Sequence, residues 1–246
     1  MQKQNPQLLI FDFDGCLYPF PENFIEILDT ANGQSGHEIS RGEWPHDIAA
    51  KRSLESYLNQ GFAFKRAAEE YNICLHEASI IHHRNIDFDL KRDEDLIAAF
   101  KDIDRSLVFP MILTQGSRCN VDRHLPKIGI ENEIARNMRI SVDEHGYDRL
   151  KSNSEYPWLF AKWRAEHVSG LQFADKDIHV FEDSPKNLVI PDQLGWNTVF
   201  VHHANPLDTL PPHIHRQTRT TADILREMPQ RHRRTVNHLT QTPDLG

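Results

Sequence analysis

Residues 8–15 of this 246-residue chain read LLIFDFDG, and this stretch decides the expected fold. Four consecutive apolar residues, followed by acidic residues and a glycine, are typical of a buried parallel strand. Similar apolar runs recur at residues 111–113, 178–181 and 198–201, with a weaker one at 138–142. The segments between the later runs, residues 120–128 and 154–167, have helical patterns. Strands that alternate with helices predict an α/β protein with a doubly wound, mainly parallel sheet.

Residues 19–104 interrupt this alternation, because they contain several helical patterns and no good strand candidate. The expected helices are residues 22–31, 47–59, 62–71, 76–83 and 93–102. The last begins at Asp93, a good N-terminal capping residue, and places apolar residues at helical spacing. We therefore expect a core formed by residues 1–18 and 105–228, an inserted helical cap over 19–104, and a flexible C-terminal tail over 229–246.

The overall charge argues against a protein that binds nucleic acid polymers. The chain has 28 basic and 36 acidic side chains, a formal net charge of −8 at pH 7. Proteins that neutralise nucleic acid phosphates are typically rich in Lys and Arg. The short basic run at 231–234 is interpreted as part of a solvated tail.

The cysteines and the N-terminus predict a cytoplasmic protein. Only three cysteines occur, Cys16, Cys74 and Cys119, and they are far apart in sequence. Residues 1–7 lack the charged and then apolar layout of a signal peptide. We expect no membrane partner, because no apolar stretch approaches the ~18 residues needed to span a bilayer.

The ends of the expected strands carry the residues with the most chemistry. Ligands of open α/β sheets bind beyond the carboxyl ends of the strands, so residues that directly follow the apolar runs are expected to share one pocket. These residues are Asp12 and Asp14, Thr114 and Gln115, and Glu182 and Asp183. Clustered carboxylates repel one another unless a cation lies between them, and oxygen ligands favour Mg²⁺ over Zn²⁺. The sequence therefore predicts an acidic Mg²⁺ site that could admit a phosphate ester.

Four segments in this order resemble the motifs of the haloacid dehalogenase-like superfamily. They are residues 12–18, DFDGCLY, residues 113–116, LTQG, Lys151 within LKSNS, and residues 180–187, VFEDSPKN. The first motif, the helical stretch 57–83 and the residues 182–198 are also similar to the pyrimidine 5′-nucleotidase branch. The resemblance covers the whole expected core and implies a Rossmann-like fold with an inserted cap.

The resemblance also implies a role for each residue. Asp12 would be the nucleophile that forms an aspartyl-phosphate, and Asp14 would be the general acid and base. Thr114, Gln115 and Lys151 would bind the substrate phosphate. Mg²⁺ would be held by Asp12, the Asp14 backbone carbonyl, Glu182 and Asp183. The Pro that often follows the motif lysine is missing after Lys151, so Lys162 and Lys186 are alternative candidates for its role.

The expected activity is Mg²⁺-dependent hydrolysis of a small phosphate monoester, with a nucleoside 5′-monophosphate as the specific substrate. Phe62 and Phe64 are candidates for contacting the base, and the cap would exclude water and select the leaving group. The alternatives are a sugar-phosphate phosphatase or phosphomutase, a haloacid dehalogenase, and a non-catalytic binding protein. Asp14 argues against dehalogenation, because a halide leaves without being protonated. The sequence leaves the oligomeric state open.

Overall fold

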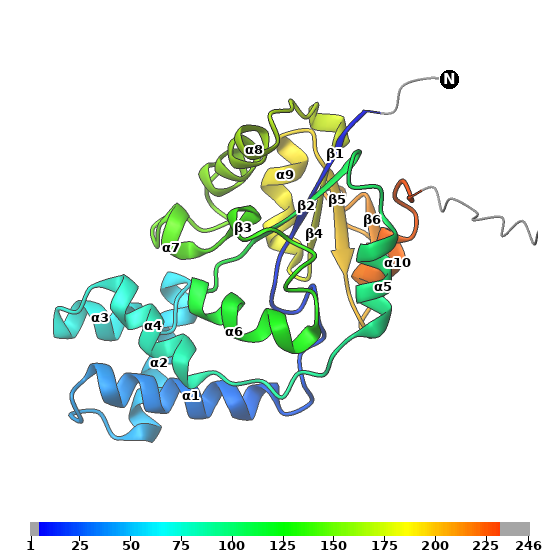
Figure 1. The fold of residues 1–246 in the computed structure, drawn as a ribbon. Coiled ribbons are helices and arrows are strands. Elements are labelled where there is room, and N and C mark those ends of the chain that lie inside the picture. Colours follow the sequence, from blue (N-terminus) through cyan, green and yellow to red (C-terminus); the bar gives the residue numbers. More distant parts are fainter. Residues whose placement is uncertain (1–4, 232–246) are drawn as a thin grey trace, which may run out of the picture.

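The computed structural model describes residues 5–231, and its centre is a parallel sheet (Figure 1). Six strands pair in the order β3-β2-β1-β4-β5-β6, and every pairing is parallel. The strands are β1 (Gln7–Phe11), β2 (Val108–Leu113), β3 (Arg139–Ile140), β4 (Ile178–Glu182), β5 (Asn197–Val201) and β6 (Arg216–Thr218). The five apolar runs of the sequence all lie in or around strands, so the predicted doubly wound α/β fold is confirmed.

Five helices lie between β1 and β2. They are α1 (Phe24–Ile39), α2 (His46–Gln60), α3 (Lys65–Tyr71), α4 (Leu75–Asn85) and α5 (Glu94–Asp102). The later helices are α6 (Arg118–Ile128), α7 (Val142–His145), α8 (Tyr156–Ser169), α9 (Val189–Gln193) and α10 (Thr221–Leu225), with 3₁₀ turns η1 (Arg136–Met138), η2 (Asp175–Asp177) and η3 (Pro185–Leu188). Figure 1 shows α1 to α4 as a group to one side of the sheet, at the lower left.

Helix α1 runs eight residues beyond its predicted end at Ala31, through two glycines. Glycine weakens an isolated helix, which is why the pattern predicted a shorter one. Here the glycines allow α2 to approach closely. A Cβ on Gly33 would lie 2.8 Å from the carbonyl oxygen of His46, and one on Gly36 would lie 2.8 Å from Cβ of Ala49. Close packing with α2 therefore extends α1.

Two hydrophobic clusters divide the inserted helices. The smaller cluster contains Ile39, Trp44, Phe62 and Phe64 and is built mainly from α1 to α4. The buried side chains of α5 belong to the larger cluster around the sheet, which also takes in Phe24, Ile27, Leu28 and Ala31 of α1. Helix α5 packs against α10. A cap over the whole of 19–104 stays a prediction. We propose a narrower cap, formed by α1 to α4, with α5 as part of the core.

The residues that follow α10 contact the core. Ile103 forms an antiparallel bridge with Gln230, and Arg231 N–H donates to the Asp102 carbonyl oxygen at 2.7 Å. Residues 229–231 therefore contact the core, and the flexible tail from residue 229 stays a prediction. The rest of that prediction, from residue 232 onward, lies outside the described residues.

Candidate active site

The site forms where three adjacent strands end at the same edge of the sheet. Strand β1 lies between β2 and β4, and Phe11 is in register with both Ile112 and Phe181. Asp12 follows β1 directly, and its backbone N–H donates to the Phe181 carbonyl oxygen at 2.9 Å. Parallel register thus brings residues 12, 114 and 182–183 to one edge, as the strand-end rule predicts.

Lys151 joins this edge from the loop between α7 and α8. Its ammonium group donates to Asp12 Oδ1 at 2.6 Å, to Glu182 Oε1, and to the Leu113 carbonyl oxygen at 3.3 Å. An ammonium has three donors, so all of them are used. The carbonyl oxygen of Lys151 accepts from Trp158 Nε1 at 2.9 Å, which fixes the loop on α8. The structure therefore places Lys151 beside the expected nucleophile.

The alternative lysines lie elsewhere. Lys162 donates to Asp175 Oδ1 at 2.8 Å, before β4, and Lys186 is exposed on η3. Burial opposes the charge of Lys151, but Asp12 and Glu182 outweigh it and raise the pKa of Lys151. The side chain is 1% exposed and stays charged, because its partners are acidic.

Asp12, Glu182 and Asp183 form a compact carboxylate cluster. One oxygen from each lies within 4.8 Å of the others. Burial and the charge of Glu182 raise the pKa of Asp12 to about 7, although Lys151 acts in the opposite direction. Burial and the charges of Glu182 and Asp12 raise the pKa of Asp183 to about 9. Three carboxylates face one lysine, so a further cation would offset the remaining negative charge of the cluster.

The ligand set fits a hard divalent cation. All of the donor atoms are carboxylate oxygens, which suit Mg²⁺ better than the softer transition metals. Glu182 is the most constrained member. Its oxygens accept from Lys151, from Asn187 Nδ2 at 2.7 Å and from Ser184 N–H at 3.0 Å. Glu182 therefore orients Lys151, and its predicted role as a direct metal ligand stays a prediction.

Asp14 and Thr114 lie on another side of the site, around Gly116. A Cβ on Gly116 would lie 3.2 Å from Asp14 Oδ2 and 3.3 Å from Thr114 Oγ1. The Asp14 carboxylate accepts from Asn120 Nδ2, at 3.1 Å for Oδ1 and 3.0 Å for Oδ2, and from the Tyr18 hydroxyl. Two neutral donors hold this carboxylate away from the Lys151 cluster. Its environment therefore differs from that of Asp12.

Thr114 and Gln115 directly follow β2. The hydroxyl of Thr114 accepts from the Gly116 N–H at 2.9 Å, and its carbonyl oxygen lies 3.2 Å from His145 Nε2. Thr114 is buried at the edge of the sheet, while Gln115 is half-buried. Their contacts with a substrate stay predictions.

The loop after β1 is fixed by contacts that the sequence did not indicate. Gly15 has a φ of +76°, and a Cβ at this position would collide with the Asp183 carboxylate. Its carbonyl oxygen lies 2.9 Å from His203 Nε2, and the carbonyl oxygen of Cys16 accepts from Thr221 Oγ1 at 2.9 Å. Glycine is therefore required for both its backbone conformation and its closeness to Asp183.

Sequence reasoning also missed Asn120 and left Asn187 without a role. Asn187 lay in the quoted stretch 180–187, so its position five residues after Glu182 was a usable signal. Asn120 lies on the first turn of the helix that follows β2, a place from which side chains can reach the ends of the strands. The contact between Asn120 and Asp14 joins residues 106 positions apart, which no local pattern predicts.

Comparisons with known proteins identify the fold. No protein-family model matches the chain, and no curated protein matches it. A HAD phosphatase from Thermococcus onnurineus is similar in structure, with a TM-score of 0.59 and 15% identity over 90% of this chain and 96% of that one. The fold is that of haloacid dehalogenase-like proteins.

Enzymes with different chemistry share this fold. An L-2-haloacid dehalogenase from Xanthobacter autotrophicus has a TM-score of 0.52 at 14% identity, covering 90% of this chain and 97% of that one. A putative beta-phosphoglucomutase from Thermotoga maritima has a TM-score of 0.54 at 14% identity, with the same coverage. The haloacid dehalogenase-like fold is therefore established, and the reaction has to be argued from the site. Within residues 5–231, every helix is too short or too polar to cross a bilayer.

Proposed function

We propose that the chain is a Mg²⁺-dependent phosphomonoester hydrolase that works through an aspartyl-phosphate. The observation that carries this proposal is the contact of Lys151 with Asp12 inside the carboxylate cluster. The Lys151 ammonium at 2.6 Å favours the ionised form of Asp12 and leaves its other oxygen available for attack. Asp12, Asp183 and the Asp14 carbonyl oxygen would hold the cation, which when bound would offset the charge between the acidic site and an anionic ester.

In the proposed reaction, an oxygen of Asp12 attacks phosphorus and the bond to the leaving oxygen breaks. Protonated Asp14 gives its proton to that oxygen, so the product leaves as a neutral alcohol. Asp14, now ionised, then takes a proton from water, and the resulting hydroxide attacks the phosphorus of the aspartyl-phosphate. The P–O bond to Asp12 breaks, which releases inorganic phosphate and restores both carboxyl groups. Thr114 would bind a phosphoryl oxygen throughout, and the Lys151 ammonium would offset the negative charge that Asp12 and the phosphoryl group share.

Asp14 is the reason to propose phosphatase chemistry in preference to dehalogenation, which the fold also supports. Its carboxylate is held by Asn120 and Tyr18, beside Thr114 and outside the carboxylate cluster. A halide leaves without a proton, whereas an alkoxide leaving group needs one. A positioned acid is therefore useful in phosphate ester hydrolysis and not in dehalogenation.

For the substrate we propose a nucleoside 5′-monophosphate, with pyrimidine bases preferred. This proposal rests on the sequence resemblance of residues 12–18 and 182–198, and on α1 to α4 acting as a cap that selects the leaving group. Phe62 and Phe64 are now weaker candidates for base contact. They are 5% and 2% exposed and pack against Tyr147 in the smaller hydrophobic cluster.

The test is a panel of phosphate monoesters with Mg²⁺, in which UMP and CMP are compared with AMP, GMP and sugar phosphates. Phosphate release from UMP and CMP above the others supports the whole proposal. Release only from sugar phosphates would keep the phosphatase and remove the nucleotide. Isomerised sugar phosphate without free phosphate would indicate a mutase. Halide release from a 2-haloacid, unaffected by EDTA, would replace the proposal with dehalogenation.

A further inference from the structure

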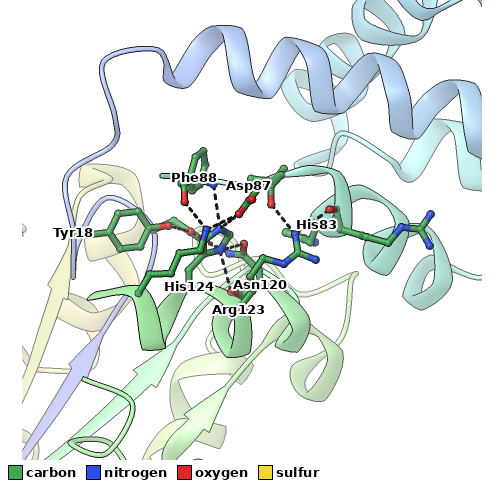
Figure 2. A network of polar contacts seen from close by, with 11 residues as sticks. Tyr18, His83, Asp87, Phe88, Asn120, Arg123 and His124 are labelled. Carbon is green, nitrogen blue, oxygen red and sulfur yellow. Dashed lines mark hydrogen bonds and ion pairs between the residues drawn. The ribbon is translucent and has the colours of Figure 1, made fainter. Parts of the chain in front are cut away.

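Helix α6 connects Asp14 to the polypeptide that leaves the helices of the proposed cap. Three of its polar residues, Asn120, Arg123 and His124, lie three and four positions apart and so share one face of the helix. Figure 2 shows these three side chains together, with Tyr18 at the left, Phe88 and Asp87 above them and His83 at the right. Apart from the contact of Asn120 with Asp14, the proposed chemistry uses none of the three.

Backbone contacts fix the protonation of His124. The Phe88 N–H donates to His124 Nε2 at 3.2 Å, and a backbone N–H can only donate. Nε2 is therefore the acceptor, and the ring proton lies on Nδ1. Burial lowers the pKa of His124, in agreement with a neutral ring, and its side chain is fully buried.

The orientation of Asn120 follows from this tautomer. His124 Nδ1 lies 3.0 Å from Asn120 Oδ1 and 3.1 Å from the Asn120 carbonyl oxygen, so the ring N–H is shared between these two acceptors. The amide nitrogen of Asn120 is then directed at the Asp14 carboxylate, to which it donates at 3.0 and 3.1 Å. A flipped amide would place an N–H against an N–H and an oxygen against a carboxylate. Only one orientation satisfies all of the groups.

The backbone that precedes Phe88 is also held in place, by Arg123. Arg123 Nη1 donates to the carbonyl oxygens of His83, Arg84 and Ile86, at 3.0, 2.9 and 2.8 Å. These carbonyls lie at the C-terminal end of α4, directly before Phe88 (Figure 2). Arg123 thus fastens the exit of α4 to α6, which places the Phe88 N–H against His124.

We propose that Phe88 N–H, His124 and Asn120 form a relay that positions Asp14 as the general acid of the proposed reaction. Asn120 and His124 are positioning residues, because only Asp14 would touch the leaving group. The relay starts where the chain leaves the proposed cap. The position of Asp14 therefore also depends on how α4 packs against α6. This inference rests on the proposed function.

The test compares leaving groups. An alkyl phosphate such as a nucleoside monophosphate needs protonation of its leaving oxygen, whereas 2,4-dinitrophenyl phosphate does not. In Asn120→Leu and His124→Phe, kcat on the alkyl ester should fall about 10²-fold, with KM nearly unchanged, while kcat on the dinitrophenyl ester changes little. His124→Asn retains a donor near the position of Nδ1 and should recover most of the lost activity on the alkyl ester.

Folding and a remote variant serve as controls. Thr198→Val removes a buried hydroxyl on β5 that donates to the His213 carbonyl oxygen at 2.8 Å, and should affect both esters equally. Thermal unfolding of each variant separates loss of fold from loss of positioning. In Asn120→Leu, His124 Nδ1 keeps a partner, because the Asn120 carbonyl oxygen lies 3.1 Å away. Equal losses on both esters in well-folded variants would overturn the relay and leave the phosphatase intact. A wild-type protein without any phosphate release would instead overturn the proposed function.

Discussion

Lys151 Nζ lies 2.6 Å from Asp12 Oδ1, although 139 positions separate the two residues in the sequence. The pair is buried, and Glu182 on a third segment shares the ammonium group. The contact gives one test for the nucleophile and another for the charge balance of the site.

Asp12→Asn should abolish hydrolysis and leave the fold intact. The amide has the same shape and keeps a hydrogen-bonding oxygen for Lys151, but it cannot act as the nucleophile. We expect kcat to fall at least about 10³-fold, measured as phosphate release with Mg²⁺. Asp192→Asn, which affects only a pair with His215 at 2.9 Å, should retain activity. Turnover in Asp12→Asn would remove the nucleophile assignment.

Lys151→Met should destabilise the protein as well as inactivate it. The substitution leaves Asp12 and Glu182 buried without their cation, and breaking a buried pair costs about 3–5 kcal/mol. Lys162→Met removes an exposed pair with Asp175 and should cost less than about 1 kcal/mol. Denaturant unfolding and phosphate release measure both effects. If Lys162→Met lost activity and Lys151→Met kept it, the lysine assignment would be reversed.

Removal of the cation should stop hydrolysis, and its addition should stabilise the fold. At roughly a hundred times its Kd, Mg²⁺ would add about 2.7 kcal/mol to the free energy of unfolding. Asp183→Asn should lose most of this increase, because Asp183 follows β4 within the carboxylate cluster. Asp177→Asn, at the other end of the same strand, should keep it. The comparison is made by thermal unfolding in EDTA and in Mg²⁺, and equal shifts in both variants would contradict the site.

Gly15→Ala should reduce both activity and stability. The alanine would be strained at a φ of +76° and its Cβ would collide with the Asp183 carboxylate. Gly195 provides a control with almost the same φ, +77°, because nothing lies within 4 Å of an added Cβ there. Gly195→Ala should therefore cost only the backbone strain, about 1 kcal/mol, and leave kcat unchanged. Similar kcat values for the two variants would argue against a close Gly15–Asp183 contact.

The stability contributed by Asp143 should depend on pH. This carboxylate accepts from the Arg118 N–H at 2.6 Å, from Ser141 at 3.1 Å, from the Tyr147 hydroxyl, and from His76 on α4 at 3.0 Å. Burial acts to raise the pKa of Asp143, but the hydrogen bonds, the strongest from Arg118 N–H, lower it below its ordinary value. A depressed pKa stabilises the fold above the unfolded pKa of about 4, and this contribution is lost as pH falls through the folded pKa.

Asp143→Asn is therefore expected to lower the free energy of unfolding by about 1–3 kcal/mol at neutral pH, with a smaller difference in acid. Denaturant unfolding at several pH values measures it. Asp148→Asn is the control, because Asp148 is exposed and its nearest cation, on Arg149, is 3.9 Å away. A pH-independent difference for Asp143→Asn would contradict the assigned charge state.

The sequence determined the strands and the residues that follow them. Apolar runs such as residues 8–11 and 178–181 are buried on both faces of a parallel sheet, so their composition is sufficient to find them. Strand β6 was missed because it lies at an edge and Arg216 is exposed, which leaves no apolar run. Once the strands are known, parallel order brings Asp12, Thr114 and Asp183 to one edge.

Tertiary structure decided what each of these residues touches. The contact of Lys151 with Asp12, the pairing of Asp14 with Asn120 and the packing of α5 against α10 all depend on contacts between distant segments. Local patterns record which face of a strand or helix is apolar, and they carry no information about which loop folds over it. The candidate site residues are therefore predictable from the ends of the strands, whereas their contacts are set by tertiary packing.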